Sequence, residues 1–424
     1  MPDNGASPSQ RKRVAASGVV GNVLEWYDFS LYGYLAPITA PLFFPSDDPL
    51  TSLVQSFAVF AIGFVARPIG GVIYGHIGDR MGRRHLLMLS VVAMAVPTVL
   101  MGLLPTYEAI GIAAPILLVV LRLVQGLSAG GEFSGSIIFL VEHAPPGRRG
   151  FMGSLSNFGA MIGGLLGLFV GWLVTEWLDA ETMSDWGWRI PFLAGVLVSL
   201  FGLWVRKGMP DSPAYVSLQK AGQILRNPIV NAFRHQSRPM LITVGLNWIV
   251  SAGYYVVFVW LITDLTKVAG LDMHDAMGIG VLGLAFGMAL TPVMGHLSDR
   301  IGQRAMLVIA SLLTAVAVVP LLLLADIGTY GSGLAAQLGL AFLMAMLLGT
   351  MPAVFVSLFT ADARCSSMSI GYNAALALFG GTSPLIATYL VDVTGWSGAP
   401  GLYLAVTALV CLALVPFVPR SMTD

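Results

Sequence analysis

Residues 74–84 read YGHIGDRMGRR, a polar and basic stretch with long apolar segments on both sides. This pattern predicts a short turn between two membrane-spanning helices, in which glycine supplies a positive φ and lets the helix ends approach closely. The carboxylate of Asp79 is suited to accept hydrogen bonds from the N-terminus of a neighbouring helix. The arginines are suited to pair with acids at other helix ends, such as Glu142.

The same stretch returns at residues 294–304 as MGHLSDRIGQR, with six of eleven positions identical. Each identical pair lies 220 positions apart, which is about half of the 424-residue chain. An internal repeat at this offset indicates two homologous halves. The turn residues of interest are Gly75, Asp79, Arg80, Gly82, Arg83 and Arg84 in the first copy and Gly295, Asp299, Arg300, Gly302 and Arg304 in the second.

The composition is that of a polytopic membrane protein. Only 10% of the residues are charged and 56% are hydrophobic, whereas soluble proteins carry about 25% charged residues. A net charge of zero gives no reason to expect a nucleic-acid partner. The sequence has no phosphate-binding loop, metal-ligand cluster or catalytic constellation, so we expect neither an enzyme nor a cofactor nor a metal.

The chain is expected to be an all-α membrane protein with twelve transmembrane helices. The predicted spans are 18–44, 53–77, 85–104, 110–141, 151–178, 189–206, 239–265, 276–298, 305–325, 332–358, 366–392 and 400–418. They divide into an N-terminal six-helix bundle (1–206), a polar linker (207–238) and a C-terminal six-helix bundle (239–424). Within the linker, residues 211–225 are expected to form a short amphipathic helix on the membrane surface.

The basic residues predict the orientation in the membrane. With the N-terminus in the cytoplasm, 18 of the 22 lysines and arginines fall on cytoplasmic segments. The positive-inside rule therefore places both termini in the cytoplasm, which also requires an even number of spans.

Five charged residues fall inside predicted spans, where each costs about 2.5–3.5 kcal/mol or more. They are Glu25, Asp28, Arg67, Arg122 and Glu132. Such groups face a bundle interior, a partner or a water-filled cavity. Each alone is equally well explained as half of a buried structural ion pair, but the set as a whole favours a transport site.

The first span carries two acids, Glu25 and Asp28, which share a helix face because they are three residues apart. We expect them to face a central cavity, with Trp26 and Tyr27 pointing elsewhere. A partly desolvated carboxylate can bind and release a proton near neutral pH, so Glu25, Asp28 and Glu132 are proton-coupling candidates. Arg122 is expected to reach Glu25 or Asp28.

Other residues are candidates for substrate binding. Arg67 is at about mid-depth, where a guanidinium can clamp a carboxylate at two points. Arg122 is a second such cation. Arg189, beside two tryptophans, is either a third or an interfacial anchor. Asn247, Tyr254 and Tyr255 on the seventh span are further candidates. The two tyrosine rings could hold a quaternary ammonium by cation–π contact, or belong to an aromatic belt.

These motifs resemble the major facilitator superfamily over the whole chain. Four of them resemble its metabolite:proton symporter family: GNVLEWYDF (21–29), RLVQGLSAGGE (122–132), WGWRIPF (186–192) and GYNAALALFGGTSPLIATYL (371–390). Members of that family carry α-ketoglutarate, citrate, shikimate, proline or betaine with protons. The resemblance implies a central cavity open alternately to either side, and it places Asp79 and Arg83 in a gating loop.

The sequence thus predicts a monomeric symporter of the bacterial inner membrane that imports a small carboxylate-bearing metabolite with protons. A carrier of a zwitterionic osmolyte, such as proline or betaine, is the first alternative. A proton-driven drug exporter is the second. The partners expected are the substrate, protons and the lipid bilayer.

Overall fold

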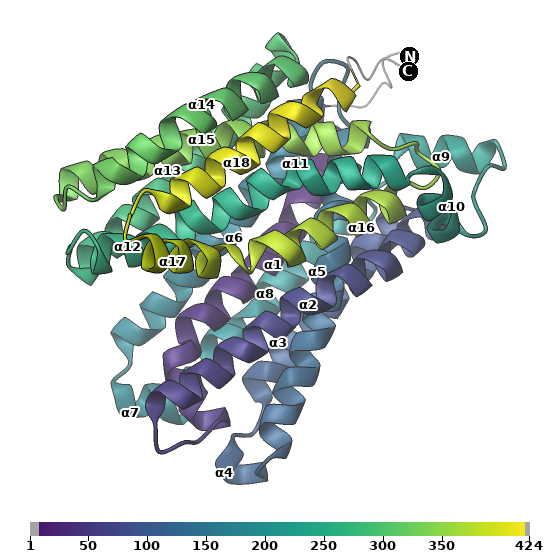
Figure 1. Cartoon of the computed structure of the whole chain (residues 1–424). Coiled ribbons are helices and arrows are strands. Elements are labelled where there is room, and N and C mark those ends of the chain that lie inside the picture. Colours follow the sequence, from purple (N-terminus) through teal and green to yellow (C-terminus); the bar gives the residue numbers. More distant parts are fainter. Residues whose placement is uncertain (1–7, 420–424) are drawn as a thin grey trace.

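The computed structural model describes residues 8–419, and every regular element in that range is a helix (Figure 1). The long helices of the first half are α1 (Pro8–Phe43), α2 (Pro49–Met81), α3 (Arg83–Leu103), α5 (Ala113–Glu142), α6 (Arg149–Trp177) and α8 (Arg189–Arg206). The membrane spans of the second half are built from α11 (Ser237–Tyr255), α12 (Leu261–Lys267), α13 (Met273–Ile301), α14 (Gln303–Ala325), α15 (Tyr330–Ser357), α16 (Arg364–Ala375), α17 (Ser383–Thr394) and α18 (Ala399–Leu414).

Two spans of the second half contain a π-helical turn that the sequence did not predict. One turn (Val256–Trp260) joins α11 to α12, and the other (Leu376–Gly380) follows α16 and precedes α17. Four short helices lie between spans: α4 (Tyr107–Ile110), α7 (Ala180–Thr182), α9 (Pro213–Lys220) and α10 (Pro228–His235).

The predicted all-α membrane fold is confirmed. Within the described residues, 11 helical segments are long and apolar enough to cross a membrane. The twelfth segment is α1, which has 36 residues but is less apolar because it carries Asn22, Glu25 and Asp28. The predicted spans match the observed helices to within a few residues at most ends, because long apolar runs separated by polar turns are the clearest signal in such a sequence.

The long helices pack in two groups. In the first, α1 packs on α6, and α5 packs on α2 and α3; in the second, α15 packs on α13 and α14, and α18 on α14. The groups meet where α6 contacts α13 and α15, and where α2 contacts α16. Glycine makes the closest packing possible: a Cβ on Gly126 or Gly130 would overlap the α2 backbone at Gly63 or Arg67.

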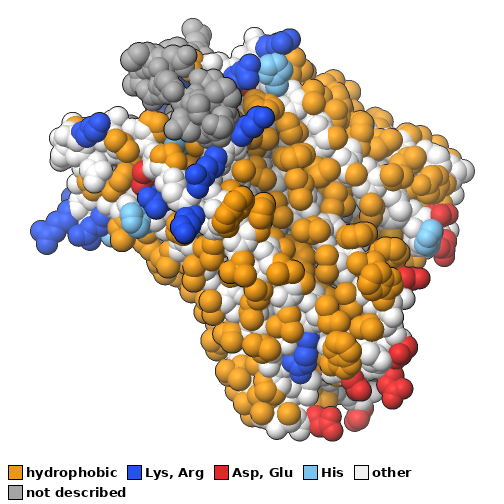
Figure 2. All heavy atoms as spheres, turned by 180° about the vertical axis from the view of Figure 1, so that it is seen from behind, with side chains coloured by type: hydrophobic (Ala, Val, Ile, Leu, Met, Phe, Trp, Pro, Cys, Tyr) orange, Lys and Arg blue, Asp and Glu red, His pale blue; other side chains and the backbone are white. Residues whose placement is uncertain are grey.

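The molecule has a basic end and an acidic end. Figure 2 shows Lys and Arg gathered at one end, acids at the other and a broad hydrophobic surface between them. The basic end carries the 80–84 turn and the helices α9 and α10. Exposed acids at the other end include Glu108, Glu176, Asp179, Glu181 and Asp185. In Figure 1 the two groups converge beside α9 and α10, whereas α4 and α7 lie well away from α12 and α17.

The repeated turns have the backbone geometry that their glycines predict. Gly82 has a φ of 102° and Gly302 a φ of 94°, and each directly precedes the helix that follows its turn. L-residues rarely adopt this conformation, so the same turn requires glycine in both halves.

The linker agrees with the prediction in part. A short helix, α9, lies within the predicted stretch 211–225 but covers only Pro213–Lys220, and a second short helix, α10, which was not predicted, follows after a turn at Gly222. Proline begins each of them, because its fixed φ suits the first helical position. Tyr215 of α9 is buried against the 80–84 turn, so this face of α9 packs on protein.

Candidate functional site

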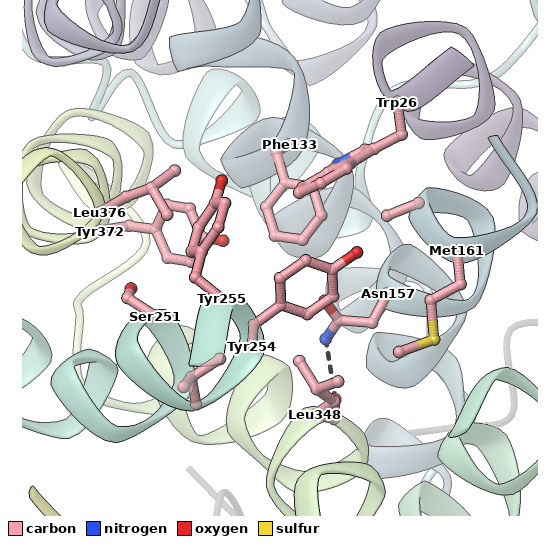
Figure 3. Close-up of a pocket in the computed structure, with 12 residues that line it drawn as sticks. Trp26, Phe133, Asn157, Met161, Ser251, Tyr254, Tyr255, Leu348, Tyr372 and Leu376 are labelled. Carbon is pink, nitrogen blue, oxygen red and sulfur yellow. Dashed lines mark hydrogen bonds between the residues drawn. The ribbon is translucent and has the colours of Figure 1, made fainter. Parts of the chain in front are cut away.

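A pocket lies between the two groups of helices. Six long helical segments contribute to its wall, three from each half of the chain. The lining residues are Trp26, Phe133, Asn157, Ala160 and Met161 from the first half, and Val250, Ser251, Tyr254, Tyr255, Leu348, Tyr372 and Leu376 from the second (Figure 3).

Aromatic rings dominate this wall. The Trp26 and Tyr254 rings meet edge to face with their centroids 5.5 Å apart, and Tyr254 meets Tyr255 in the same way at 5.6 Å. On the other side, Phe133 stacks on Tyr372 with centroids 5.3 Å apart. Figure 3 shows rings from both halves facing the same space. Such a box of ring faces is suited to an organic cation, especially a quaternary ammonium group.

Polar groups in the same wall are left without partners. The indole N–H of Trp26 and the hydroxyls of Ser251 and Tyr255 are buried, and none of them has a hydrogen-bond partner within residues 8–419. Buried donors are normally satisfied, so these three groups are available to hydrogen-bond a ligand in the pocket. Asn157 differs, because its side-chain N–H₂ donates to the Leu348 carbonyl at 2.8 Å and so bridges the two halves.

The expectation for Trp26 was wrong. It lines the pocket, whereas Glu25 and Asp28 are not among the lining residues and contact neighbouring helices of the first half. The shared face of the two acids was correctly predicted, but it is turned towards α2, α3 and α5 rather than the central space. Tyr27 does point elsewhere, and its hydroxyl donates to the Pro191 carbonyl at 2.6 Å.

Glu25 forms a buried ion pair with Arg67 directly behind the pocket wall. The carboxylate Oε1 accepts from the guanidinium Nη2 at 2.5 Å, and the second oxygen of Glu25 and the Nε of Arg67 have no partner in the described part of the chain. The guanidinium lies over the Phe64 ring, which in turn meets the Tyr255 ring at 6.2 Å. The Phe64 ring therefore lies between the ion pair and Tyr255 of the pocket wall.

Asp28 and Arg122 are linked through Gln125, not directly as predicted. Gln125 donates to the Asp28 carboxylate at 3.3 Å and accepts from Arg122 at 2.9 Å. Asp28 also accepts from the hydroxyl of Thr98. The Arg122 guanidinium lies over the Tyr32 ring, 3.6 Å from its centroid. An amide fills the place of a direct contact because it can accept from the cation and donate to the acid at the same time.

Glu132 pairs with Arg206, which sequence reasoning had placed on the cytoplasmic side of the sixth span. Their closest atoms are 2.5 Å apart, and both side chains are fully buried. Ser90 also donates to Glu132, and Arg206 donates to the carbonyls of Ser17 and Leu87. Every polar atom of this pair is therefore satisfied within the first half.

Two other predicted binding residues lie outside the pocket. Arg189 donates to the carbonyls of Gly102 and Leu104 at 3.0 and 2.7 Å, so it caps the end of α3, and its guanidinium lies over Trp188. Asn247 donates to the Tyr372 carbonyl at 3.2 Å. Of the predicted substrate residues, the structure brings only Tyr254 and Tyr255 to the wall.

At the basic end, each turn aspartate caps a helix of the opposite half. Asp79 accepts from the backbone N–H of Cys365 and Ser366, at 3.0 and 2.8 Å, at the start of α16. Asp299 accepts from the N–H of Gly150 and Phe151, at 2.7 and 2.8 Å, at the start of α6. Gly75 and Gly295 make this approach possible, because a Cβ on either would collide with the opposing backbone. The predicted helix-capping role of these acids is confirmed.

Glu142 completes the contacts between the halves. It pairs with Arg83 at 3.2 Å, as predicted, and also with Arg364 of the second half at 2.6 Å. Arg83 further donates to the Ala361 carbonyl across the interface. We call Asp79, Arg83, Glu142, Asp299 and Arg364 the basic-end network.

The remaining turn arginines do not join this network. Arg80, Arg84 and Arg300 are exposed, and Arg304 donates to the carbonyls of Pro416 and Val418 near the end of α18. Next to Glu142 lies His143, whose pKa is lowered below its ordinary value because the ring is buried.

Comparisons with known proteins agree with the fold and the repeat. A family model described as Major Facilitator Superfamily matches residues 19–381 and 278–423. The proton:xylose symporter XylE, in a structure with 6-bromo-6-deoxy-D-glucose, aligns over 98% of this chain and 97% of its own, with a TM-score of 0.80 and 17% identity. The inward-open conformation of XylE from Escherichia coli aligns with a TM-score of 0.63 at 17% identity, covering 98% of both chains.

Several curated transporters are similar along almost the whole chain. The ectoine/proline transporter ProP of Corynebacterium glutamicum is 32% identical, over 99% of this chain and 86% of its own. The proline/betaine transporter of Escherichia coli K12 is 33% identical, over 95% of this chain and 82% of its own. The inner membrane metabolite transport protein YhjE of the same strain is 36% identical, over 96% and 94%. These relatives are transporters rather than enzymes, and the chain belongs to the Major Facilitator Superfamily.

Proposed function

We propose that this protein is a proton-coupled importer of a zwitterionic osmolyte such as proline or glycine betaine. The observation that carries the proposal is the pocket wall, which combines an aromatic box with three unsatisfied hydrogen-bonding groups. The names of the relatives from Corynebacterium glutamicum and Escherichia coli point the same way. The names of these relatives support a zwitterionic osmolyte as the substrate better than the organic acid that the sequence led us to expect.

The pocket chemistry favours a zwitterion over an organic acid. The ring faces of Trp26, Tyr254 and Tyr255 suit an ammonium group. The N–H of Trp26 and the hydroxyls of Ser251 and Tyr255 are hydrogen-bond donors available to the carboxylate of such a ligand. No arginine or lysine is among the lining residues, and Arg67 behind the wall is paired with Glu25, so the second or third carboxylate of a di- or tricarboxylate would have no cation to neutralise it.

We propose that transport proceeds by alternating access between the two bundles, 1–206 and 239–424. In this structure the basic-end network joins the halves, whereas the acidic ends stand apart (Figure 1). By the positive-inside rule the basic end faces the cytoplasm, so this conformation is closed to the cytoplasm. The network is then the gate that opens for release, and its residues include both repeated turns.

The Glu25–Arg67 pair is the proposed coupling site. A substrate carboxylate that draws the guanidinium of Arg67 towards Tyr255 would leave Glu25 without its partner. An unpaired carboxylate in a buried site is stabilised by binding a proton, so substrate and proton would be taken up together. Asp28 is the second candidate because the neutral groups of Thr98 and Gln125 both donate to its Oδ2, while its Oδ1 has no partner in the described part of the chain.

Uptake into proteoliposomes tests this proposal. Purified protein is supplied in sodium-free buffer with labelled glycine betaine, proline, succinate or shikimate, with and without an inward proton gradient. We expect gradient-driven uptake of the two zwitterions that a protonophore abolishes. Uptake of the acids but of neither zwitterion would refute the substrate, and equal uptake without a gradient would refute proton coupling.

A pair of variants tests the aromatic box itself. Tyr254→Leu removes a pocket ring, and Tyr389→Leu removes an exposed ring of the same half. A cation–π contact contributes about 0.5–2 kcal/mol, so the first variant should weaken betaine binding by about twofold to thirtyfold and the second should leave it unchanged. Equal affinity in both variants would show that Tyr254 is only packing.

A further inference from the structure

The polar linker makes two separate sets of contacts with the basic-end network. The first involves the stretch from Asp211 to Tyr215 and lies on the first half. Asp211 accepts from the backbone N–H of Arg83 at 2.9 Å and of Arg84 at 3.4 Å, so it caps the start of α3. That helix has no side-chain cap of its own, because Gly82 occupies the capping position.

Tyr215 fixes the other side of the same turn. Its hydroxyl donates to the Arg80 carbonyl in the last turn of α2 at 3.0 Å, and the guanidinium of Arg83 lies over its ring. The hydroxyl of Ser212 accepts from the backbone N–H of Tyr215 at 3.2 Å and so caps α9. This first anchor, formed by Asp211 and Tyr215, therefore holds both arms of the glycine turn.

The second anchor is α10, which also contacts α2 but donates its side-chain hydrogen bonds to the other half of the chain. The side-chain N–H₂ of Asn231 donates to Asp362 at 2.9 Å, and that of Gln236 donates to Thr360 at 2.7 Å. Both acceptors belong to the turn between α15 and α16. The same turn provides the Ala361 carbonyl that accepts from Arg83, and Arg364 at its end pairs with Glu142.

We infer that the linker is a strap across the gate, with Asp211 and Tyr215 as positioning residues on one side and Asn231 and Gln236 on the other. Opening of the basic end separates the α2–α3 turn from the α15–α16 turn, and these are the two surfaces that the anchors join. The strap thus favours the closed conformation without contacting the substrate pocket. The inference rests on the proposed alternating access.

Nothing in the fold requires two anchors. Seven residues, 221–227, join α9 to α10, and the first three of them are exposed. A linker of this length could connect the two halves as a solvated chain with no contacts to either. Instead, polar side chains at each anchor hydrogen-bond a turn of the basic end. The two anchors therefore hold the linker against both halves of the protein.

The chain contains its own reporter of gate opening. Cys365 is fully buried beside Asp79 and Gly78 in the network, whereas Cys411 is fully buried within the second half, on α18. Opening of the basic end should expose Cys365 to a maleimide and leave Cys411 protected. The rate of Cys365 labelling, measured by mass spectrometry with Cys411 as internal reference, reports the open fraction in the purified full-length protein without any substrate.

We expect Asp211→Ala to raise the Cys365 labelling rate about fivefold, the usual effect of losing a helix cap. Tyr215→Phe and Asn231→Ala should raise it by smaller factors, and Gln219→Ala, an exposed position on α9, should leave it unchanged. A twelve-residue Gly/Ser insertion after Gly222 keeps every contact but slackens the strap. From loop-closure entropy it should raise the rate about fourfold.

The insertion is the deciding variant. If Asp211→Ala accelerates labelling but the insertion does not, Asp211 is only a local cap and the strap is refuted. If neither changes labelling in protein that still takes up substrate, the positioning role is refuted as well. Failure of betaine uptake would refute the proposed substrate instead, because the labelling assay needs no substrate.

Discussion

The Oε1 of Glu25 lies 2.5 Å from a guanidinium nitrogen of Arg67, and one polar atom on each side chain is left without any partner among residues 8–419. A buried pair selected only for stability would have all of its polar atoms satisfied, as Glu132 and Arg206 do. The incomplete Glu25–Arg67 pair beside the pocket is therefore better suited than Glu132–Arg206 to exchange partners during transport.

Arg67→Lys should weaken substrate binding even though it keeps the charge. Lysine is a point charge and cannot offer the planar guanidinium fork that serves Glu25 and a ligand together. Losing one charge-assisted hydrogen bond costs about 1.5–3 kcal/mol, or about tenfold to a hundredfold in Kd. Equilibrium binding of labelled betaine measures this, with the exposed Arg84→Lys as the control. Unchanged affinity would give Arg67 a purely structural role.

Glu25→Gln should abolish accumulation driven by a proton gradient while keeping substrate counterflow. The amide imitates the protonated acid, so the carrier can still cycle with substrate on both sides but cannot couple to protons. Asp28→Asn is the matched variant on the same helix face. If Glu25→Gln still accumulates substrate against a gradient and Asp28→Asn does not, the coupling site belongs to Asp28.

The sequence predicted the fold well because apolar runs, the basic turns and the 220-residue repeat are local signals. Even the positive φ of Gly82 and Gly302 and the capping by Asp79 and Asp299 could be expected from the repeat. The linker was harder to predict, because α9 and α10 are held by contacts with turns far along the chain.

The candidate site was predicted less completely. Helical spacing showed that Glu25 and Asp28 share a face, but not which neighbouring helix that face meets, so Trp26 was assigned away from the pocket. The partner of Glu132 is Arg206, 74 positions away, and no spacing rule links the two. Phe133, Asn157 and Tyr372 are pocket residues that sequence reasoning missed, although the quoted motifs contain or border two of them.

Asp79→Asn should impair transport without abolishing substrate binding. The Asp79 carboxylate caps α16 and also lies 3.5 Å from Arg83, so its loss weakens the closed conformation by about 1–2 kcal/mol. Asp299→Asn should have a smaller effect, because the second turn has Gln303 where the first has Arg83. Betaine uptake and betaine binding, measured on the same preparations, separate the two effects. Loss of binding in folded protein would contradict a gating role.

Glu132→Gln should unfold the protein more easily and should not remove proton coupling in the molecules that remain folded. Glu132 neutralises Arg206, which is fully buried and has only backbone carbonyls as its other partners. Removing one member of a buried pair costs about 3–5 kcal/mol because a charge is left uncompensated, whereas replacing both with apolar groups is often neutral. The apparent Tm should therefore fall strongly in Glu132→Gln and recover in Glu132→Leu/Arg206→Met. Glu176→Gln, an exposed position near the end of α6, should change stability by less than about 0.5 kcal/mol. Normal stability of Glu132→Gln together with lost proton-driven uptake would instead make Glu132 the coupled acid.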